Sequence, residues 1–184
     1  YAKTKQMMYS EPELWNTLMK KLSEVVRLYL RAQVTAGAQA IQLFDSWIGA
    51  LSPTDYREFI LPHVQHILQD VAKTGVPVIH FGTGTATLLE LQKEAGGTVI
   101  GVDWRTPLGA ARARLGNDVA VQGNLDPLLL FAPRPLLEKR VVEVLDAAGP
   151  APGHIFNLGH GILPETSPDS VRFVADVVHE RSRR

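Results

Sequence analysis

The stretch VPVIHFGTGTATLLELQKEAGGTVIGVD, residues 76–103, decides the fold class of this chain. It opens with a strand-like apolar run over 76–81 and continues after a polar loop as a short helix over about 86–94. A pair of glycines ends that helix, and 98–102 is a second strand-like run that delivers Asp103 at its end. Strand, polar tip, helix, glycine and strand in this order indicate a β/α unit with parallel strands.

The same alternation continues in both directions along the chain. Apolar positions on one helical face predict a helix over about 11–37, and the spacing of Ser10 and Glu13 predicts a capping box at its start. A helix over 52–75 is expected to begin with a Ser-Pro cap and to break or kink at Pro62. The other predicted elements are strands over 38–44, 118–122 and 154–157, and helices over 107–115, over 135–148 and after Ser167-Pro168.

Five strands alternating with helices call for a parallel sheet, either doubly wound or part of a closed barrel. Four of the five strand ends carry polar clusters, whereas a doubly wound sheet usually gathers its ligand loops near one switch point. The clusters are Asp45-Ser46, Asp103, Gly123-Asn124 with Asp126, and Gly159-His160-Gly161. This spread favours a TIM (β/α)8 barrel of the α/β class. We expect residues 1–184 to form a single domain with about five C-terminal β/α units, because five strands cannot close a barrel.

The composition excludes several classes of protein. The chain has 184 residues, 45% of them hydrophobic and 21% charged, as in an ordinary globular domain. Nineteen Lys and Arg balance nineteen Asp and Glu, so neither nucleic acid nor a membrane surface is an expected partner. The absence of Cys excludes disulfides, thiolate zinc sites and cysteine nucleophiles. We expect a cytoplasmic protein, since no apolar run approaches the roughly 20 residues of a membrane span and no signal peptide opens the chain.

Two polar residues at strand ends are the leading candidates for ligand contact. His160 lies between two glycines, which allow a ligand to approach the imidazole closely. Ser46 offers a hydroxyl at another strand end, but Phe44 stands where a G-x-S-x-G nucleophile elbow requires glycine. A hydrolase triad of Ser46, His160 and Asp103 is therefore only a formal alternative.

Two other patterns lead to no site. Gly82-Thr-Gly-Thr85 follows a strand, yet position 87 is Thr where a dinucleotide fingerprint has Gly, and no Gly-Lys-Ser/Thr follows. His63 and His66 are three residues apart on a predicted helix without carboxylate-rich partners. We therefore predict no metal site and expect both histidines on a solvated helix face.

Several stretches, in this order along the chain, resemble the uroporphyrinogen decarboxylase family. They are GAQAIQLFDS (37–46) with Gly49 and Ser52-Pro53, VIGVDW (99–104), QGNLDP (122–127), and NLGHG (157–161) with Pro164. The resemblance implies a TIM-barrel carboxy-lyase of haem biosynthesis that uses neither metal nor organic cofactor. Such an enzyme removes carbon dioxide from the four acetate side chains of uroporphyrinogen III and yields coproporphyrinogen III.

The resemblance also implies roles for the two candidate residues. Ser46 matches the serine that hydrogen-bonds the substrate near its carboxylates, and His160 matches the loop histidine that contacts a substrate carboxylate. The family's arginine-rich motif, its catalytic aspartate and its substrate-binding tyrosine belong upstream of Tyr1, so no catalytic residue is assigned within this chain. The 184-residue chain alone is therefore expected to be inactive, and the complete enzyme is expected to be a homodimer.

Two alternatives remain open at this stage. A methyltransferase of the same superfamily shares the barrel but uses zinc held by His-x-Cys and a second Cys, and the corresponding stretch here is His80-Phe81-Gly82. The missing thiolates disfavour that reading. The other alternative is a non-catalytic relative that binds a tetrapyrrole or a protein partner.

Overall fold

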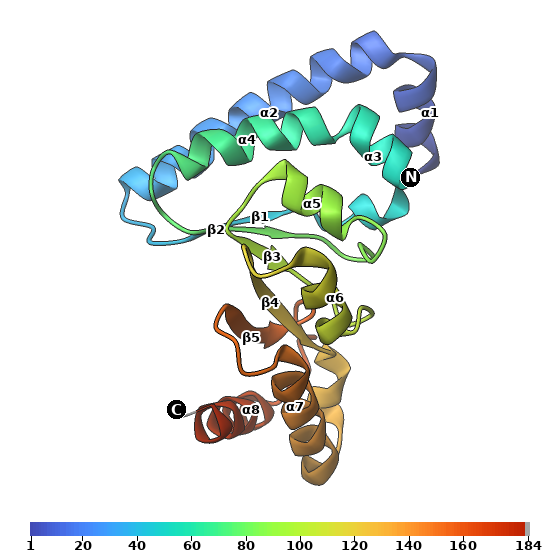
Figure 1. Cartoon of the computed structure of the whole chain (residues 1–184). Helices are drawn as coiled ribbons and strands as arrows, with labels where there is room; N and C mark the ends of the chain where they lie inside the picture. The colour runs from blue at the N-terminus through green and yellow to red at the C-terminus, as the bar shows by residue number, and fades with distance from the viewer. Residues whose placement is uncertain (183–184) are drawn as a thin grey trace.

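Five parallel strands form one sheet in the order in which they occur in the chain. We describe residues 1–182 from a computed structural model (Figure 1). The strands are β1 (Ile41–Phe44), β2 (Val78–Phe81), β3 (Val99–Gly101), β4 (Ala120–Leu125) and β5 (His154–Leu158). A doubly wound sheet reverses its strand order at a switch point, whereas a barrel adds each strand beside the last. The order β1-β2-β3-β4-β5 confirms the prediction of a partial barrel.

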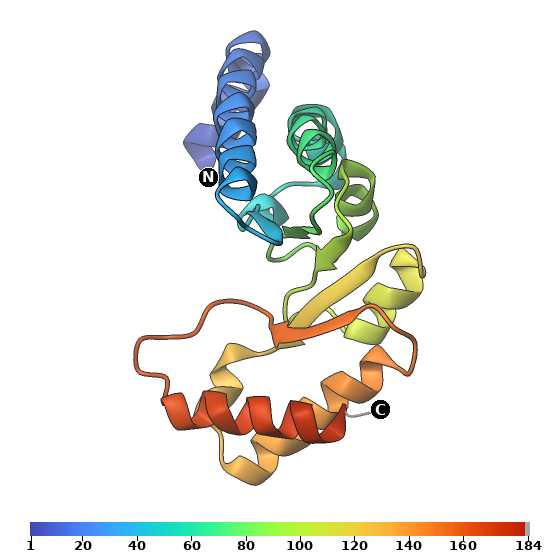
Figure 2. The ribbon, with the colours of Figure 1, turned by 90° about the vertical axis from the view of Figure 1, so that its left-hand side faces the viewer.

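Helices connect the strands and cover one face of the sheet. Figures 1 and 2 show α1 to α4 gathered at one end of the molecule and α7 and α8 at the other. The helices are α1 (Ala2–Ser10), α2 (Pro12–Thr35), α3 (Pro53–Phe59), α4 (Leu61–Ala72), α5 (Leu89–Ala95), α6 (Leu108–Leu115), α7 (Arg134–Ala148) and α8 (Pro168–Arg181), with short 3-10 helices η1 (Ile48–Ala50) and η2 (Pro127–Phe131). Within the described residues, no helix combines the length and the apolar character that crossing a membrane requires.

The hydrophobic core lies between this helical layer and the sheet. Alternate strand residues point toward the helices, and Val78, Ile100 and Val121 are at most 1% exposed. Leu68 and Val71 of α4 are completely buried against the same layer. The other face of the strands carries Gln42, Phe44 and Gln122, and no helix of residues 1–182 packs on it (Figures 1 and 2).

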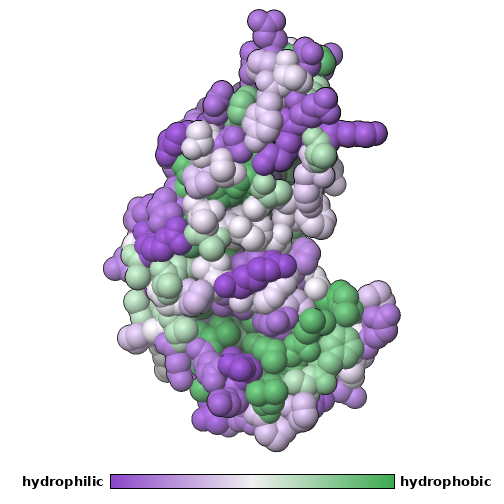
Figure 3. Space-filling view, turned by 90° about the vertical axis from the view of Figure 1, so that its right-hand side faces the viewer, coloured by the Kyte–Doolittle hydropathy of each residue, from purple (hydrophilic) through white to green (hydrophobic). Residues whose placement is uncertain are grey.

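Apolar side chains also remain on the surface. Figure 3 shows apolar surface on the lower part of one face, at the height of α7 and α8 in Figure 1. Leu128 and Phe131 of η2 are 59% and 50% exposed, and Ile162 after β5 is 51% exposed. Ile162 lines the cavity beside His160, whereas Leu128 and Phe131 lie close together in the chain, and exposed apolar side chains of this kind can serve a protein contact.

Helix boundaries confirm most of the sequence predictions and correct one. The hydroxyls of Ser52 and Ser167 accept backbone N–H groups at the starts of α3 and α8, and Pro62 lies at the start of α4, where the predicted helix breaks. The predicted capping box at Ser10 is wrong, because Ser10 ends α1 and its hydroxyl donates to the carbonyl of Gln6.

Two further predictions need correction. The strand predicted over 118–122 continues as far as Leu125, so that Gly123 and Asn124 pair with β5 and do not form a terminal loop. His63 is buried, not solvated, because its face of α4 packs against α2 and its Nε2 lies 3.1 Å from Oδ1 of Asn16.

Candidate functional site

The predicted polar clusters meet at the carboxyl edge of the sheet, because all five strands run in the same direction. Ser46 follows β1, Asp103 follows β3, Asn124 lies near the end of β4 and His160 follows β5. In barrels this edge carries the reactive groups. In the structure, His160 and Ser46 face cavities, whereas Asp103 and Asn124 hold neighbouring loops together.

His160 lies in a stack of three rings. Its ring centroid is 6.1 Å from that of Phe81 with planes at 23°, and 6.2 Å from that of Trp104 with planes at 13°. The residue is exposed, and within residues 1–182 its ring nitrogens make no hydrogen bond. The stack therefore fixes the plane of the imidazole while its polar atoms remain available to a ligand.

Gly159 allows this stack to form. A Cβ at Gly159 would lie 2.3 Å from the backbone nitrogen of Trp104, so only glycine lets the two segments approach this closely. Gly161, on the other side of His160, has no atom within 4 Å of the equivalent position. The close approach that Gly159 permits is thus to the backbone of Trp104, and the predicted approach of a ligand to His160 stays a prediction.

A cavity of about 310 Å³ lies beside His160 on the uncovered face of the strands. Phe44, Phe81 and Ile162 supply apolar wall, while Gln42 and Gln122 add amides that hydrogen-bond to one another at 3.3 Å. An apolar wall with a few fixed polar groups is typical of a small-molecule site.

Ser46 lies at the same edge but in a second cavity of about 250 Å³, lined also by Trp15, Trp47 and residues of α1. The amide and hydroxyl of Thr83 both donate to its carbonyl, at 3.3 and 2.5 Å, which fixes the backbone and leaves its hydroxyl free within the described chain. Phe44 lines both cavities. The structure thus brings Ser46 and His160 to one rim without placing them in contact.

Asp103 holds two loops together. Its carboxylate is completely buried and accepts hydrogen bonds from the backbone N–H of Gly84 at 2.7 Å and from Nη1 of Arg105 at 2.8 Å. Neither oxygen bonds to His160 in the described residues, so the triad of Ser46, His160 and Asp103 does not form.

The polar groups after β4 are also structural. Nδ2 of Asn124 donates to the carbonyls of Asp103 and Thr106, at 2.8 and 2.5 Å. Asp126 accepts the backbone N–H of Leu128 at 2.9 Å and thereby caps η2.

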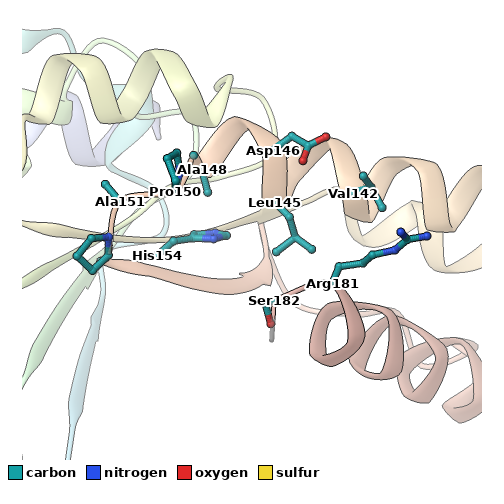
Figure 4. A pocket seen from close by; sticks show the side chains of 12 residues that line it. Val142, Leu145, Asp146, Ala148, Pro150, Ala151, His154, Arg181 and Ser182 are labelled. Carbon is teal, nitrogen blue, oxygen red and sulfur yellow. The ribbon is translucent and has the colours of Figure 1, made fainter. Parts of the chain in front are cut away.

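Sequence reasoning missed a further cavity, which lies away from these residues. It has a volume of about 710 Å³ and is lined by residues of α7, the start of β5 and the end of α8 (Figure 4). Burial lowers the pKa of His154 in its wall, and Nε2 of that ring lies 2.8 Å from the carbonyl oxygen of Gly123. The cavity is at the amino end of β5, opposite the polar edge, so we do not assign it the chemistry.

The pairing of Asp45 with His80 was also missed. Nε2 of His80, which is completely buried on β2, lies 3.5 Å from Oδ2 of Asp45. Only the register of β1 on β2 brings the two residues together, and no local pattern indicates it. Among residues 1–182, no group of three His, Cys, Asp or Glu side chains is arranged to hold a metal ion.

Comparison with known proteins gives consistent matches. A family model described as "Uroporphyrinogen decarboxylase (URO-D)" matches residues 1–181. The proteins named uroporphyrinogen decarboxylase from Sorangium cellulosum and Salinispora tropica are 65% and 54% identical to this chain, and each match covers 100% of it. The chain spans about half of these relatives, 52% and 50% of their lengths, and matches their C-terminal half.

Solved structures support the fold. A methyltransferase from Methanosarcina mazei superimposes with a TM-score of 0.86 at 19% identity, covering 98% of this chain and 53% of its own. An archaeal fructose 1,6-bisphosphate aldolase gives a TM-score of 0.54 at 17% identity, covering 81% of this chain and 60% of its own. At such identities the similarity shows the architecture alone.

Proposed function

This chain belongs to the uroporphyrinogen decarboxylase family, and on that premise we propose that it supplies the C-terminal part of a decarboxylase of haem biosynthesis. The complete enzyme removes carbon dioxide from the four acetate side chains of uroporphyrinogen III and yields coproporphyrinogen III without a cofactor. The family match over residues 1–181 carries the proposal. The available polar groups of Ser46 and His160 at the carboxyl edge of the sheet support it.

We propose that His160 and Ser46 bind and orient substrate carboxylates. A ring N–H of His160 and the hydroxyl of Ser46 are both suitable donors for a carboxylate oxygen. Because Phe81 and Trp104 already hold the imidazole plane, binding orders this side chain at little further entropic cost. The apolar wall around Phe44 suits the face of a tetrapyrrole ring.

The reaction needs more charge than these residues supply. Protonating a pyrrole carbon before carbon dioxide leaves creates a cation, which a preorganised carboxylate stabilises. A substrate with eight carboxylates also calls for arginine side chains that form paired hydrogen bonds. We assign both functions to the upstream half of the barrel. The 184-residue chain alone should therefore be inactive, and turnover by a pure 20.2 kDa preparation would contradict this assignment.

The alternatives receive less support. Zinc-dependent methyl transfer relies on thiolate ligands, and this chain has no Cys. The structural match to a methyltransferase shows the fold alone at 19% identity. A non-catalytic tetrapyrrole-binding role predicts binding without loss of carbon dioxide, so an activity assay separates it from the proposal.

We further propose that the complete enzyme is a cytoplasmic homodimer. The family resemblance suggests the dimer, and the exposed apolar side chains of Leu128 and Phe131 are available to a protein contact. Sedimentation of the full-length protein, in which this chain follows the upstream half that its relatives carry, measures the oligomeric state directly. A monomer at micromolar concentration would refute the dimer.

Substitutions at the two carboxylate-binding residues test the proposed roles in the full-length protein. We expect Ser46→Ala and His160→Gln each to raise KM for uroporphyrinogen about ten-fold, because each removes one hydrogen bond to a charged group. His179→Gln, which changes an exposed histidine on α8, is the matched control and should leave KM unchanged. Unchanged KM in both site variants would exclude these two residues from substrate binding.

A further inference from the structure

A pair of polar side chains, His80 and Asp45, lies next to Ser46 at the carboxyl ends of β1 and β2. His80 is on β2 with 0% of its side chain exposed, and Asp45, just after β1, has 22% of its side chain exposed. The distance between Nε2 of His80 and Oδ2 of Asp45 is 3.5 Å. Neither atom has another hydrogen-bond partner in the described chain. An unpaired polar group in such a position is costly, so the two groups must satisfy each other.

Both ring nitrogens of His80 face acceptors. Nδ1 lies 3.3 Å from the backbone carbonyl oxygen of Gln92, which can only accept, while Nε2 faces the carboxylate of Asp45. A neutral imidazole has one N–H and one acceptor nitrogen, so it cannot serve both partners. One additional proton is required, and it belongs on His80 because imidazole is a stronger base than a carboxylate.

We propose that His80 and Asp45 form a buried imidazolium–carboxylate pair that holds the segment carrying Ser46, which makes His80 a positioning residue for the reaction. The backbone N–H of Asp45 donates to the carbonyl of Phe81 at 2.7 Å, so β1 and β2 remain joined as far as this residue. The next residue is Ser46, whose carbonyl Thr83 holds. The pair fixes the side chain of Asp45, which directly precedes Ser46. Its link to Ser46 rests on the proposed function.

Among the described residues, His80 is the one cationic partner recorded for Asp45, since Lys5, which lines the same cavity as Asp45, pairs with Asp55 at 3.8 Å. Tyr56 of α3 is completely buried, and its hydroxyl has no hydrogen-bond partner among residues 1–182. Burial, followed by the negative charges of Asp45 and Glu94, raises the pKa of Tyr56, so this side chain stays neutral. The side-chain amide of Gln92 on α5 is uncharged. The charge of Asp45 in the interior is therefore balanced by His80.

The protonation state of His80 is the first test and needs no substrate. The full-length protein is labelled with 15N-histidine, and its ring nitrogens are read by NMR at pH 7.5, with His80→Gln identifying the His80 signals. We expect both ring nitrogens to carry protons, and we expect Asp45→Asn to return the ring to its neutral form. A neutral His80 in the unsubstituted protein would overturn the proposal. His66→Gln is the control, since His66 faces Glu24 at 3.6 Å on the exposed side of α4.

Kinetics then test the positioning role. In the full-length protein, Asp45→Asn and His80→Gln should each raise KM about ten-fold with little change in kcat. Because the two residues act as one unit, KM of the double variant should also be about ten-fold higher than that of the unsubstituted protein. A KM raised about one hundred-fold in the double variant, or an unchanged KM in the single variants, would overturn the positioning role. If the unsubstituted protein does not decarboxylate uroporphyrinogen, the proposed function fails while the NMR result still decides the pair.

Discussion

Replacing Gly159 with alanine should open the ring stack that holds His160. The new Cβ would lie 2.3 Å from the backbone nitrogen of Trp104 and 2.9 Å from its Cα. Ordinary contact between such atoms is about 3.5 Å, so the two segments must separate by about 1 Å. Overpacking of this kind costs about 1–3 kcal/mol, and here it acts on backbone that a side-chain rotation cannot relieve.

The assay combines urea unfolding with steady-state kinetics on the full-length protein. We expect Gly159→Ala to lower the free energy of unfolding by about 2 kcal/mol, and to raise KM because His160 moves away from Phe81 and Trp104. Gly161→Ala is the matched control, since its Cβ meets nothing within 4 Å, and it should change stability by no more than about 0.5 kcal/mol. Equal stability and equal KM for the two variants would refute the steric account of this loop.

Three other predictions concern Asp103 at the site, Tyr56 beneath it, and His154 at the opposite edge of the sheet. Asp103→Asn should lower the free energy of unfolding by about 3 kcal/mol in urea unfolding, because the amide replaces a buried carboxylate that accepts from Gly84 and Arg105. Tyr56→Phe should leave that free energy unchanged or raise it by about 1 kcal/mol, since the hydroxyl has no partner in the described chain, and a clear loss would contradict this. Burial lowers the pKa of His154, so the unfolded chain binds more protons and stability should fall as pH drops below about 6.5. Urea midpoints from pH 7 to 5 should show a shallower slope for His154→Gln, and an equal slope would exclude this contribution.

The strands were predictable because their signals are local, and the spread of polar groups over four strand ends indicated the partial barrel. Apolar runs such as 76–81 and 98–102, each closed by a polar tip, recur at the spacing of β/α units, and the structure confirms all five strands. The capping box at Ser10 failed for a local reason, because Ser10 ends α1, whereas distant contacts decided two other failures. The burial of His63 depends on the packing of α2 against α4, and the extension of β4 to Leu125 depends on pairing with β5.

At the site, too, local patterns were predictable from the sequence and contacts between distant segments were not. A histidine between two glycines indicates close approach of a ligand, which stays a prediction, whereas the close contact of Gly159 with the backbone of Trp104 became visible only in the structure. The ring stack and the Asp45–His80 pair join residues on or after different strands, so no short sequence motif predicts them. The substrate-binding roles of Ser46 and His160 come from the family resemblance and stay predictions.

The most direct test of the central claim is an anaerobic assay of the full-length protein with uroporphyrinogen III, followed by mass spectrometry over time and without added metal. The account predicts the stepwise loss of four carbon dioxide molecules, ending at coproporphyrinogen III. An unchanged substrate mass with folded protein would contradict the assignment as a decarboxylase and favour a tetrapyrrole-binding role.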